Sequence, residues 1–465
     1  MPVDVERMLD LPGGLGRYQL VVLVMSCYST MVMAMHALIL VFVAMAPAFP
    51  GGDRCPMPPV PPEHRGLSIV VDWALTCDRK ALLAGIFVAY FVGFFVGAPG
   101  GGYLADRVGR RVCMILASVL LTAGALWCAA SQEPIAFACA RGLVGFSAGA
   151  LSVSHFVHTI EFMGSRRTMV AAIGALSFAG GICLLTLVAY FVRPWRDLLM
   201  VAFWATVPLI GMTWWVRESP KWEAALGMDV TETLHFLARF DGRPVPSILF
   251  EPPKEGPRED LFVLMRHPLA MRLAIMALAW ASVSMAYYAL AMGVESIGTD
   301  IYVSSILGAM AELPAVAMFF CLADSAYVGR RLMTVVCFVV AGGLCAMGAL
   351  LRPGSVELLI SVIVSRFCIS AAFTVLYIWG AELFPTAARN GALGIQSMFA
   401  RIGGIAASVV LVYAEAPLLY VAIPCIVAGL LCILVHETAG QPLPDTLEDV
   451  VNHEKLPVVD KGKGV

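Results

Sequence analysis

Long apolar stretches alternate with short polar segments along almost the whole chain. A helix needs roughly 20 apolar residues to cross the hydrocarbon core of a bilayer. Twelve stretches come near that length, and we place the predicted spans at 18–46, 81–102, 112–130, 135–160, 168–192, 195–216, 269–293, 301–323, 332–351, 356–381, 390–413 and 417–436. The pattern predicts an all-α membrane protein with twelve transmembrane helices.

The composition supports this class. Hydrophobic residues make up 60% and charged residues 14% of the 465 positions, and the mean hydropathy is +0.83. A soluble domain has no use for so much apolar surface. The net charge of −2 is sorted by membrane side and not gathered into a basic patch, so we expect the lipid bilayer as a partner and no nucleic acid.

Lysine and arginine are distributed unequally between the predicted loops. Of the 31, 21 fall in the termini and in alternate loops on one side, seven fall on the other side and three lie inside spans. The positive-inside rule makes the richer side cytoplasmic. Both termini are then cytoplasmic, as an even number of spans requires, and we expect a multi-pass protein of the plasma membrane.

A polar segment near the middle of the chain separates two halves of six spans each. The predicted parts are a cytoplasmic N-terminus (1–17), an N-terminal six-helix bundle (18–216) with an extracellular loop (47–80), a cytoplasmic linker with short helices (217–268), a C-terminal six-helix bundle (269–436) and a cytoplasmic tail (437–465). The extracellular loop contains Cys55 and Cys77, which an oxidising exterior allows to pair; two unpaired thiols are the alternative. No Asn-x-Ser/Thr sequon is present, so glycosylation is not predicted.

A charged signature in the first half partly recurs in the second. Residues 102–111 read GYLADRVGRR, and residues 322–331 read LADSAYVGRR. Further charges recur at offsets between 218 and 225, in the pairs Asp106 and Asp324, Arg111 and Arg331, Arg141 and Arg366, Glu161 and Glu382, and Glu218 and Glu437. The positive-inside rule explains the arginines but not the acids. The pattern indicates an internal duplication, which is typical of secondary transporters with a site between two halves.

Acids accompany the basic residues at the cytoplasmic ends of both halves. A carboxylate there can accept charge-assisted hydrogen bonds from arginine or from a helix N-terminus. Such clusters can hold the cytoplasmic side closed, although anchoring of the topology is the simpler alternative. The predicted gate consists of Asp106, Arg110, Arg111, Glu161, Arg166, Asp324, Arg330, Arg331, Glu382 and Arg389.

Three arginines fall inside predicted spans, where each costs roughly 2.5–3.5 kcal/mol and needs a partner or a wet cavity. Arg366 can pair with Glu312 of the eighth span, and Arg141 lies like Arg366 near the edge of the bilayer, so we expect structural roles for both. Arg401 lies near the middle of the eleventh span, with no acid close to it in the sequence. We expect it to face a cavity and to bind a carboxylate or sulfonate. A salt bridge to an acid distant in sequence is the alternative.

Aromatic residues share helical faces in several spans. Trp280 and Tyr287 lie on one face of the seventh span with Tyr288 beside them, and Phe373 and Tyr377 share a face of the tenth. Their rings and hydroxyls suit amphipathic substrates, whereas packing between helices is the alternative for each. The predicted substrate site consists of Arg401, Tyr287, Tyr288, Phe373, Tyr377, Trp280 and, in the fifth span, Phe178.

Several motifs together resemble a known family. Residues 102–111 resemble the loop signature of the major facilitator superfamily. More narrowly, most of the chain resembles the organic ion transporter family of solute carriers, which covers organic cation, organic anion and carnitine transporters. The matching segments are Trp73–Asp78, Glu218–Trp222, Tyr287–Tyr288, Glu312–Ala315, Glu382–Thr386, Arg389–Asn390, Arg401–Gly404, Glu437–Thr438 and Pro442–Thr446.

The resemblance implies the major facilitator fold, with two pseudo-symmetric six-helix bundles. It also implies the gate, the pair of Glu312 and Arg366 and the aromatic pocket. In this family an acid at the position of Arg401 goes with cation selectivity, and arginine goes with anion or carnitine transport. The first external loop departs from the family because it is far shorter and lacks sequons.

These observations lead to a predicted function. The sequence has neither a His/Cys cluster with metal-ligand spacing nor a nucleotide-binding Walker loop, so we expect no enzyme, no cofactor and no metal. We predict secondary-active or facilitative transport of small amphipathic organic ions, with organic anions first, by alternating access. Organic cations or carnitine-like zwitterions are one alternative, and a non-transporting scaffold or receptor is another. A counter-ion or an exchanged dicarboxylate is left open as a further partner.

Overall fold

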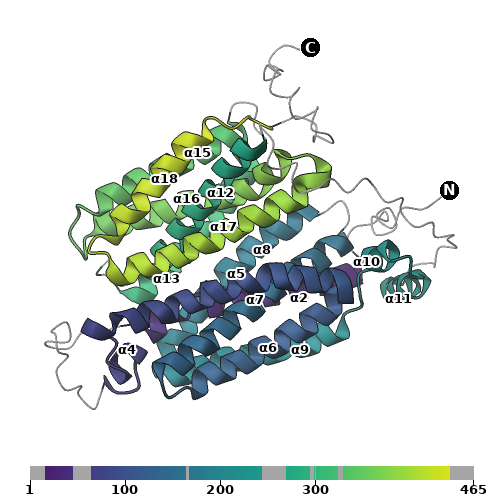
Figure 1. Ribbon diagram of the computed structural model, residues 1–465, viewed down its shortest axis with the longest axis horizontal. Helices are drawn as coiled ribbons and strands as arrows, with labels where there is room; N and C mark the ends of the chain where they lie inside the picture. Colours follow the sequence, from purple (N-terminus) through teal and green to yellow (C-terminus); the bar gives the residue numbers. More distant parts are fainter. Residues whose placement is uncertain are drawn as a thin grey trace, which may run out of the picture. The chain divides into compact units, whose positions relative to one another are not determined.

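The computed structural model divides into two compact units, Met1–Glu255 and Gly256–Val465. It describes residues 16–45, 64–163, 167–242, 269–293, 298, 300–322 and 328–439. Figure 1 shows helices as the elements of both units. Eleven helices in the described residues are long and apolar enough to cross a membrane. The predicted all-α membrane class is therefore confirmed.

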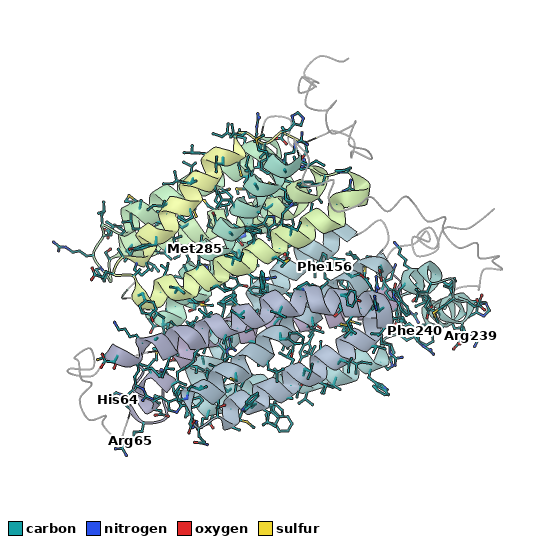
Figure 2. The ribbon with its side chains drawn as sticks, in the orientation of Figure 1. His64, Arg65, Phe156, Arg239, Phe240 and Met285 are labelled. Atoms are coloured by element: carbon teal, nitrogen blue, oxygen red, sulfur yellow. The ribbon has the colours of Figure 1, made fainter. Side chains whose placement is uncertain are left out.

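Large apolar side chains project from the outer faces of the spans (Figure 2). Trp204 is 63% exposed, Trp214 66% and Ile423 58%. Apolar surface of this extent is typical of helices that face lipid. The chain is a multi-pass membrane protein.

The first unit is built from six long spans. Their bounds are Arg17–Leu38 for α2, which α3 (Leu40–Val43) continues, Lys80–Val108 for α5, Arg110–Ala130 for α6, Pro134–Met163 for α7, Arg167–Phe191 for α8 and Trp195–Trp215 for α9. Gly109 joins α5 to α6 with a φ of 105°, a conformation that residues with a Cβ rarely adopt. Because α7 reaches Met163, Glu161 lies in its last turn.

Glycines allow α5 and α7 to approach each other closely. A Cβ at Gly97 would collide with the backbone of Phe146, and one at Gly145 would collide with the backbone of Tyr90. Small residues at such interfaces let membrane helices gain van der Waals contact where lipid weakens the hydrophobic effect. These glycines therefore bring α5 and α7 into extensive contact.

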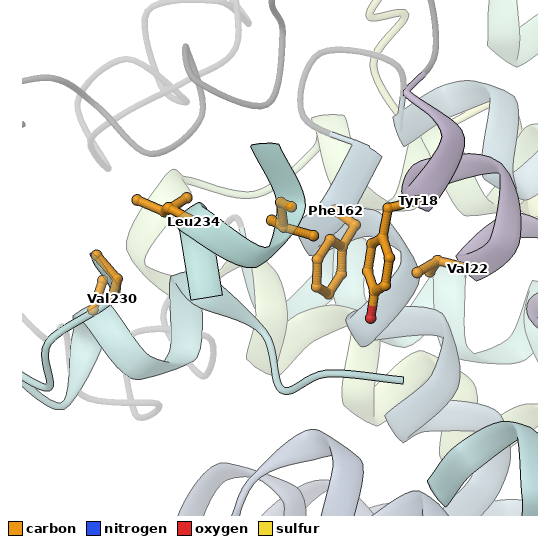
Figure 3. Packing of buried hydrophobic residues seen from close by; sticks show 7 residues of the cluster. Tyr18, Val22, Phe162, Val230 and Leu234 are labelled. Atoms are coloured by element: carbon orange, nitrogen blue, oxygen red, sulfur yellow. The ribbon is translucent and has the colours of Figure 1, made fainter. Parts of the chain in front are cut away.

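Two short helices follow the sixth span, α10 (Pro220–Ala225) and α11 (Thr231–Asp241). Figure 3 shows Leu234 of α11 in a buried apolar cluster with Phe162 of α7 and Tyr18 of α2. Asp241 accepts a hydrogen bond from the backbone N–H of Tyr18 at 3.0 Å. A carboxylate in this position also interacts favourably with the N-terminal end of a helix. Packing and charge together attach α11 to the start of α2.

Two short elements lie between the first and second spans of the first unit, α4 (Ile69–Asp72) and the 3₁₀ helix η2 (Cys77–Arg79). Cys77 is disulfide-bonded. Cys55, the partner expected from the sequence, lies outside the described residues.

The second unit contains seven helices among its described residues. Their bounds are Leu269–Met292 for α12, Ile301–Met310 for α13, Glu312–Leu322 for α14, Gly329–Gly348 for α15, Val356–Glu382 for α16, Thr386–Tyr413 for α17 and Pro417–Cys432 for α18. The last of these has 16 residues and ends before the predicted boundary at 436.

The predicted eighth span is divided between α13 and α14. Pro314 has no N–H to donate to the carbonyl of Met310, which a continuous helix would require. The helix accordingly breaks at Ala311. The break places Glu312 in the first turn of α14, in the interior of the unit.

Candidate functional site

Five aromatic side chains of the second unit form one continuous cluster. Trp280 of α12 lies 5.5 Å from Phe373 and 4.5 Å from Tyr377 of α16, measured between ring centroids. Tyr287 lies 6.1 Å from Phe373 and 5.4 Å from Tyr288. Edge-to-face and tilted contacts at these distances are favourable for aromatic rings. The helical spacings seen in the sequence thus bring five of the seven predicted site residues together.

Arg401, in the middle of α17, extends this cluster with a positive charge. Its guanidinium is close enough to the hydroxyl of Tyr288 for a hydrogen bond, and it interacts electrostatically with Tyr377. Gly403 allows the approach, because a Cβ there would collide with the backbone of Ala281 on α12. The arrangement sets a cation among phenol hydroxyls and aromatic faces, which can bind a carboxylate joined to an apolar body.

Phe178, the remaining predicted site residue, lies on α8 in the first unit and is half-buried. The cluster described above belongs entirely to the second unit. The structure of the two units taken singly therefore does not bring Phe178 to the other residues.

A buried ion pair lies next to the aromatic cluster. Arg366 of α16 donates to Glu312 at 2.9 Å, and the hydroxyl of Tyr287 donates to the same carboxylate oxygen at 2.8 Å. Glu312 is 5% exposed and Arg366 is 2% exposed. A cation–π contact of 5.7 Å between Arg366 and the ring of Tyr287 completes the network. Because both charges are buried and bonded, this network supports the cluster.

The predicted gate residues of the first unit meet where α5 ends, α6 begins and α7 ends. Arg110 forms ion pairs with Asp106 at 3.0 Å and with Glu161 at 3.3 Å. Arg111 donates to the backbone carbonyl of Trp214 at 2.6 Å. Arg166 lies outside the described residues.

Glu218, which the predicted gate did not include, holds this cluster in place. Its carboxylate accepts the backbone N–H groups of Arg110, Arg111 and Ser219 at distances from 2.9 to 3.2 Å. Burial raises the pKa of Glu218, although the same hydrogen bonds act to lower it. The carboxylate therefore closes the N-terminus of α6.

The second unit repeats this arrangement. Arg330 pairs with Glu382 at 3.1 Å, and Glu437 accepts the backbone N–H of Arg330 at 3.0 Å and that of Arg331 at 2.9 Å. The recurrence of Glu218 at Glu437 was the signal in the sequence that could have placed both carboxylates in these two charge clusters.

Arg389, another residue of the predicted gate, lies in the first turns of α17. It donates to the backbone carbonyls of Ala381 at 2.8 Å and Phe384 at 3.4 Å, at the end of α16. Asp324 lies outside the described residues.

His158 of α7 and Trp379 of α16 also correspond in the two units. Nε2 of His158 lies 2.9 Å from the carbonyl oxygen of Arg217, and Nε1 of Trp379 donates to the carbonyl of His436 at 3.1 Å. Since tryptophan only donates at this position, the shared role is that of an N–H donor that joins a helix to the segment after the last span of the unit.

Residues 145–149 match the Gly-x-Ser-x-Gly pattern of hydrolase nucleophiles. They lie inside α7, and the hydroxyl of Ser147 donates to the carbonyl of Leu143 at 2.7 Å. The nucleophile pattern requires a sharp turn between a strand and a helix. Here the pattern serves helix packing.

Comparisons with known proteins agree with this architecture. The sugar (and other) transporter family matches residues 19–448. Solute carrier family 22 member 15 of Xenopus tropicalis is 30% identical over 96% of this chain and 91% of its own length. Organic anion transporter 3 of Sus scrofa is 28% identical over 82% of this chain and 74% of its own length. Organic cation/carnitine transporter 4 of Arabidopsis thaliana is 28% identical over 94% and 88%.

Solved structures share the fold. The inward-open xylose transporter XylE from E. coli superposes with a TM-score of 0.66 at 14% sequence identity, over 93% of this chain and 99% of that one. Its partially occluded form gives a TM-score of 0.67 over 92% and 100%. At this identity the likeness establishes the fold alone.

Proposed function

Because the chain belongs to the sugar (and other) transporter family of the major facilitator superfamily, and within it to the organic-ion carriers of solute carrier family 22, we propose that it carries small organic anions across the membrane by alternating access. Relatives named for organic anions and for organic cations and carnitine support an organic ion as the substrate. The names of these relatives do not distinguish anions from cations. The proposed preference for anions therefore rests on the chemistry of Arg401.

The position of Arg401 is the observation that carries this proposal. Arg401 lies mid-helix, with its guanidinium close enough to the hydroxyl of Tyr288 for a hydrogen bond and in electrostatic interaction with Tyr377. A substrate carboxylate can accept from the guanidinium and from a tyrosine hydroxyl together, since charge-assisted hydrogen bonds are the strong ones.

Aromatic side chains beside this cation suit the apolar part of the same substrate. Phe373 and Tyr377 lie 5.6 Å apart, and the ring of Trp280 is in contact with both. A flat apolar body with one acidic group matches such a lining.

Uptake of labelled organic anions and cations by cells tests the proposal. We expect Arg401→Ala to lower kcat/KM for anions at least about tenfold, or ~1.4 kcal/mol, with unchanged surface expression. Arg401→Lys keeps the charge and should retain part of the uptake. Arg352→Ala, at an exposed position, is the matched control. Unaltered anion uptake by Arg401→Ala would contradict the proposal that Arg401 binds the anionic group of the substrate.

Transport of cations or carnitine-like zwitterions is the second candidate. The aromatic rings support it, because their faces also attract cations. Saturable uptake of cations that does not depend on Arg401 would favour this candidate. If the chain transported no organic ion saturably, a scaffold or receptor on the same fold would be the better description.

The two charge clusters supply the gate of the proposed cycle. We place both termini in the cytoplasm and the protein in the plasma membrane, so that Arg110 with Glu161 and Arg330 with Glu382 lie on the cytoplasmic side. Breaking and remaking such pairs can accompany rocking of the halves. A counter-ion or an exchanged dicarboxylate can drive the cycle, and uptake into proteoliposomes preloaded with each would identify which.

A further inference from the structure

Arg141 of α7 is a buried cation that the proposed transport site does not use. Its side chain is 1% exposed. Nη2 donates to the backbone carbonyl of His36 on α2 at 2.9 Å, and the guanidinium lies 4.8 Å above the ring of Tyr90 on α5. Nε and Nη1 are buried without a hydrogen-bond partner. An ionised group in such surroundings is costly unless its charge and its donors are satisfied.

His36 adds a second orphan group at the same place. Its side chain is 1% exposed, and its Nε2 is buried with no hydrogen-bond partner. The imidazole lies within electrostatic range of Arg141. This nitrogen can carry a hydrogen in the neutral ring, so the two residues together offer N–H donors that nothing in the described residues accepts.

Comparison with the second unit shows that Arg141 lacks a carboxylate partner among the described residues. Arg366, the counterpart of Arg141 in the second unit, also lies over a tyrosine ring, but it has Glu312 at 2.9 Å. Arg141 forms no salt bridge with any acid among the described residues, and α2 contains no acid between Arg17 and Leu38. The two units thus bury equivalent cations, and only the second supplies a carboxylate.

We propose that Arg141 and His36 bind a small monovalent inorganic anion, namely a halide, within the first unit. One negative charge balances one guanidinium beside a neutral imidazole. Full burial of both side chains restricts the ligand to one or a few atoms. The halide takes the electrostatic part that Glu312 plays in the second unit. The site is separate from Arg401, and neither proposal requires the other.

Thermal unfolding of the purified full-length protein tests the site. The wild type is compared in sodium chloride, sodium bromide and sodium gluconate at matched ionic strength, so that general screening is constant. We expect halide to raise the apparent Tm by about 2 °C or more, with a saturable dependence on concentration.

Two variants remove the need for halide in different ways. Arg141→Gln deletes the cation, and His36→Glu supplies a built-in carboxylate as the second unit does. Both should lose the difference between halide and gluconate. If Arg141→Gln does not fold, His36→Glu still decides, because it should be stable without halide. Arg401→Ala should retain the halide shift while it loses organic anion uptake, which separates the two sites.

A wild-type Tm that is indifferent to halide would overturn the proposal, since water would then be the only occupant. A halide shift of equal size in the wild type, Arg141→Gln and His36→Glu would overturn it as well.

Discussion

Arginine side chains inside the membrane-spanning helices differ in their chemical partners. Arg366 is paired with Glu312 at 2.9 Å, Arg141 is bonded to the carbonyl of His36 at 2.9 Å, and Arg401 lies beside the hydroxyl of Tyr288. Because burying a guanidinium is costly, the partner decides the role. Glu312 balances the charge of Arg366, and we propose that anionic ligands balance the charges of Arg141 and Arg401.

The ion pair of Glu312 and Arg366 gives a prediction about stability. Glu312→Leu leaves a buried guanidinium without its counter-charge, which costs about 3–5 kcal/mol in buried pairs. The double variant Glu312→Leu/Arg366→Met removes both charges and should recover most of that loss. Apparent Tm values of the purified variants measure the effect. Equal stability of the single and double variants would contradict a stabilising pair.

The raised pKa of Glu218 gives a prediction about pH. A carboxyl that burial drives to a higher pKa binds its proton more tightly in the folded state. Its contribution to stability is fully present below the unfolded pKa of about 4.3 and is lost as pH rises through the folded value. Residue 218 cannot titrate in Glu218→Gln. The stability of this variant relative to the wild type should therefore increase as the pH rises from 4 to 7. Thermal melts across this range test the sign, and a constant difference would refute it.

Helix packing in the first unit depends on the positions of its glycines. Gly97 lies against the backbone of Phe146, and Gly145 lies against that of Tyr90. In the second unit, Gly403 brings α17 against α12 in the same way. Small residues therefore set the separation of the helices that carry Arg141 and Arg401, and with it the geometry of both sites.

Alanine substitutions on α5 test this dependence. Gly97→Ala forces a Cβ into the backbone of α7, and overpacking of this kind costs about 1–3 kcal/mol. Gly100 is the matched control on the same helix, since a Cβ there meets nothing within 4 Å. Gly100→Ala should be neutral or gain about 0.5–1 kcal/mol from helix propensity. Melting of both variants measures the difference, and similar Tm values would show that α5 and α7 adjust freely.

At the scale of the whole molecule, the two units contain the same network of arginine and glutamate side chains. Each joins an arginine to a glutamate on the neighbouring long helix, at 3.3 Å for Arg110 and Glu161 and at 3.1 Å for Arg330 and Glu382. In each unit a second glutamate accepts backbone N–H groups at the start of the helix that carries this arginine. Duplication of a complete network, acids included, indicates a function that both halves perform.

Removing the arginines distinguishes a gate from a topology anchor. Arg110→Ala and Arg330→Ala should lower the maximal rate of organic ion uptake several-fold with a smaller change in KM, because the pocket residues are untouched. Arg107→Ala is the control, since Arg107 is exposed and its guanidinium lies over the ring of Tyr103. Initial rates are normalised to surface expression. If a C-terminal tag in either variant became accessible from outside intact cells, the arginines would instead anchor the topology.

The sequence by itself determined the membrane class, the approximate spans and the duplication. The hydropathy of a segment and the charge of its flanking loops decide whether and how that segment crosses a membrane. These properties do not depend on residues far away in the sequence, so they can be read from each segment alone. It also indicated the face shared by Trp280 and Tyr287, because helical periodicity is local. Even the break at Ala311 had a local cause in Pro314.

Only the tertiary structure decided which partners the charged groups take. Glu218 lies 108 residues from Arg110, and the carbonyl of His36 lies 105 residues from Arg141. Such contacts depend on which helices pack together and how closely, and glycines on distant segments set that separation. Partner choice is a property of the packed bundle because the cost of burying a charge depends on everything that surrounds it.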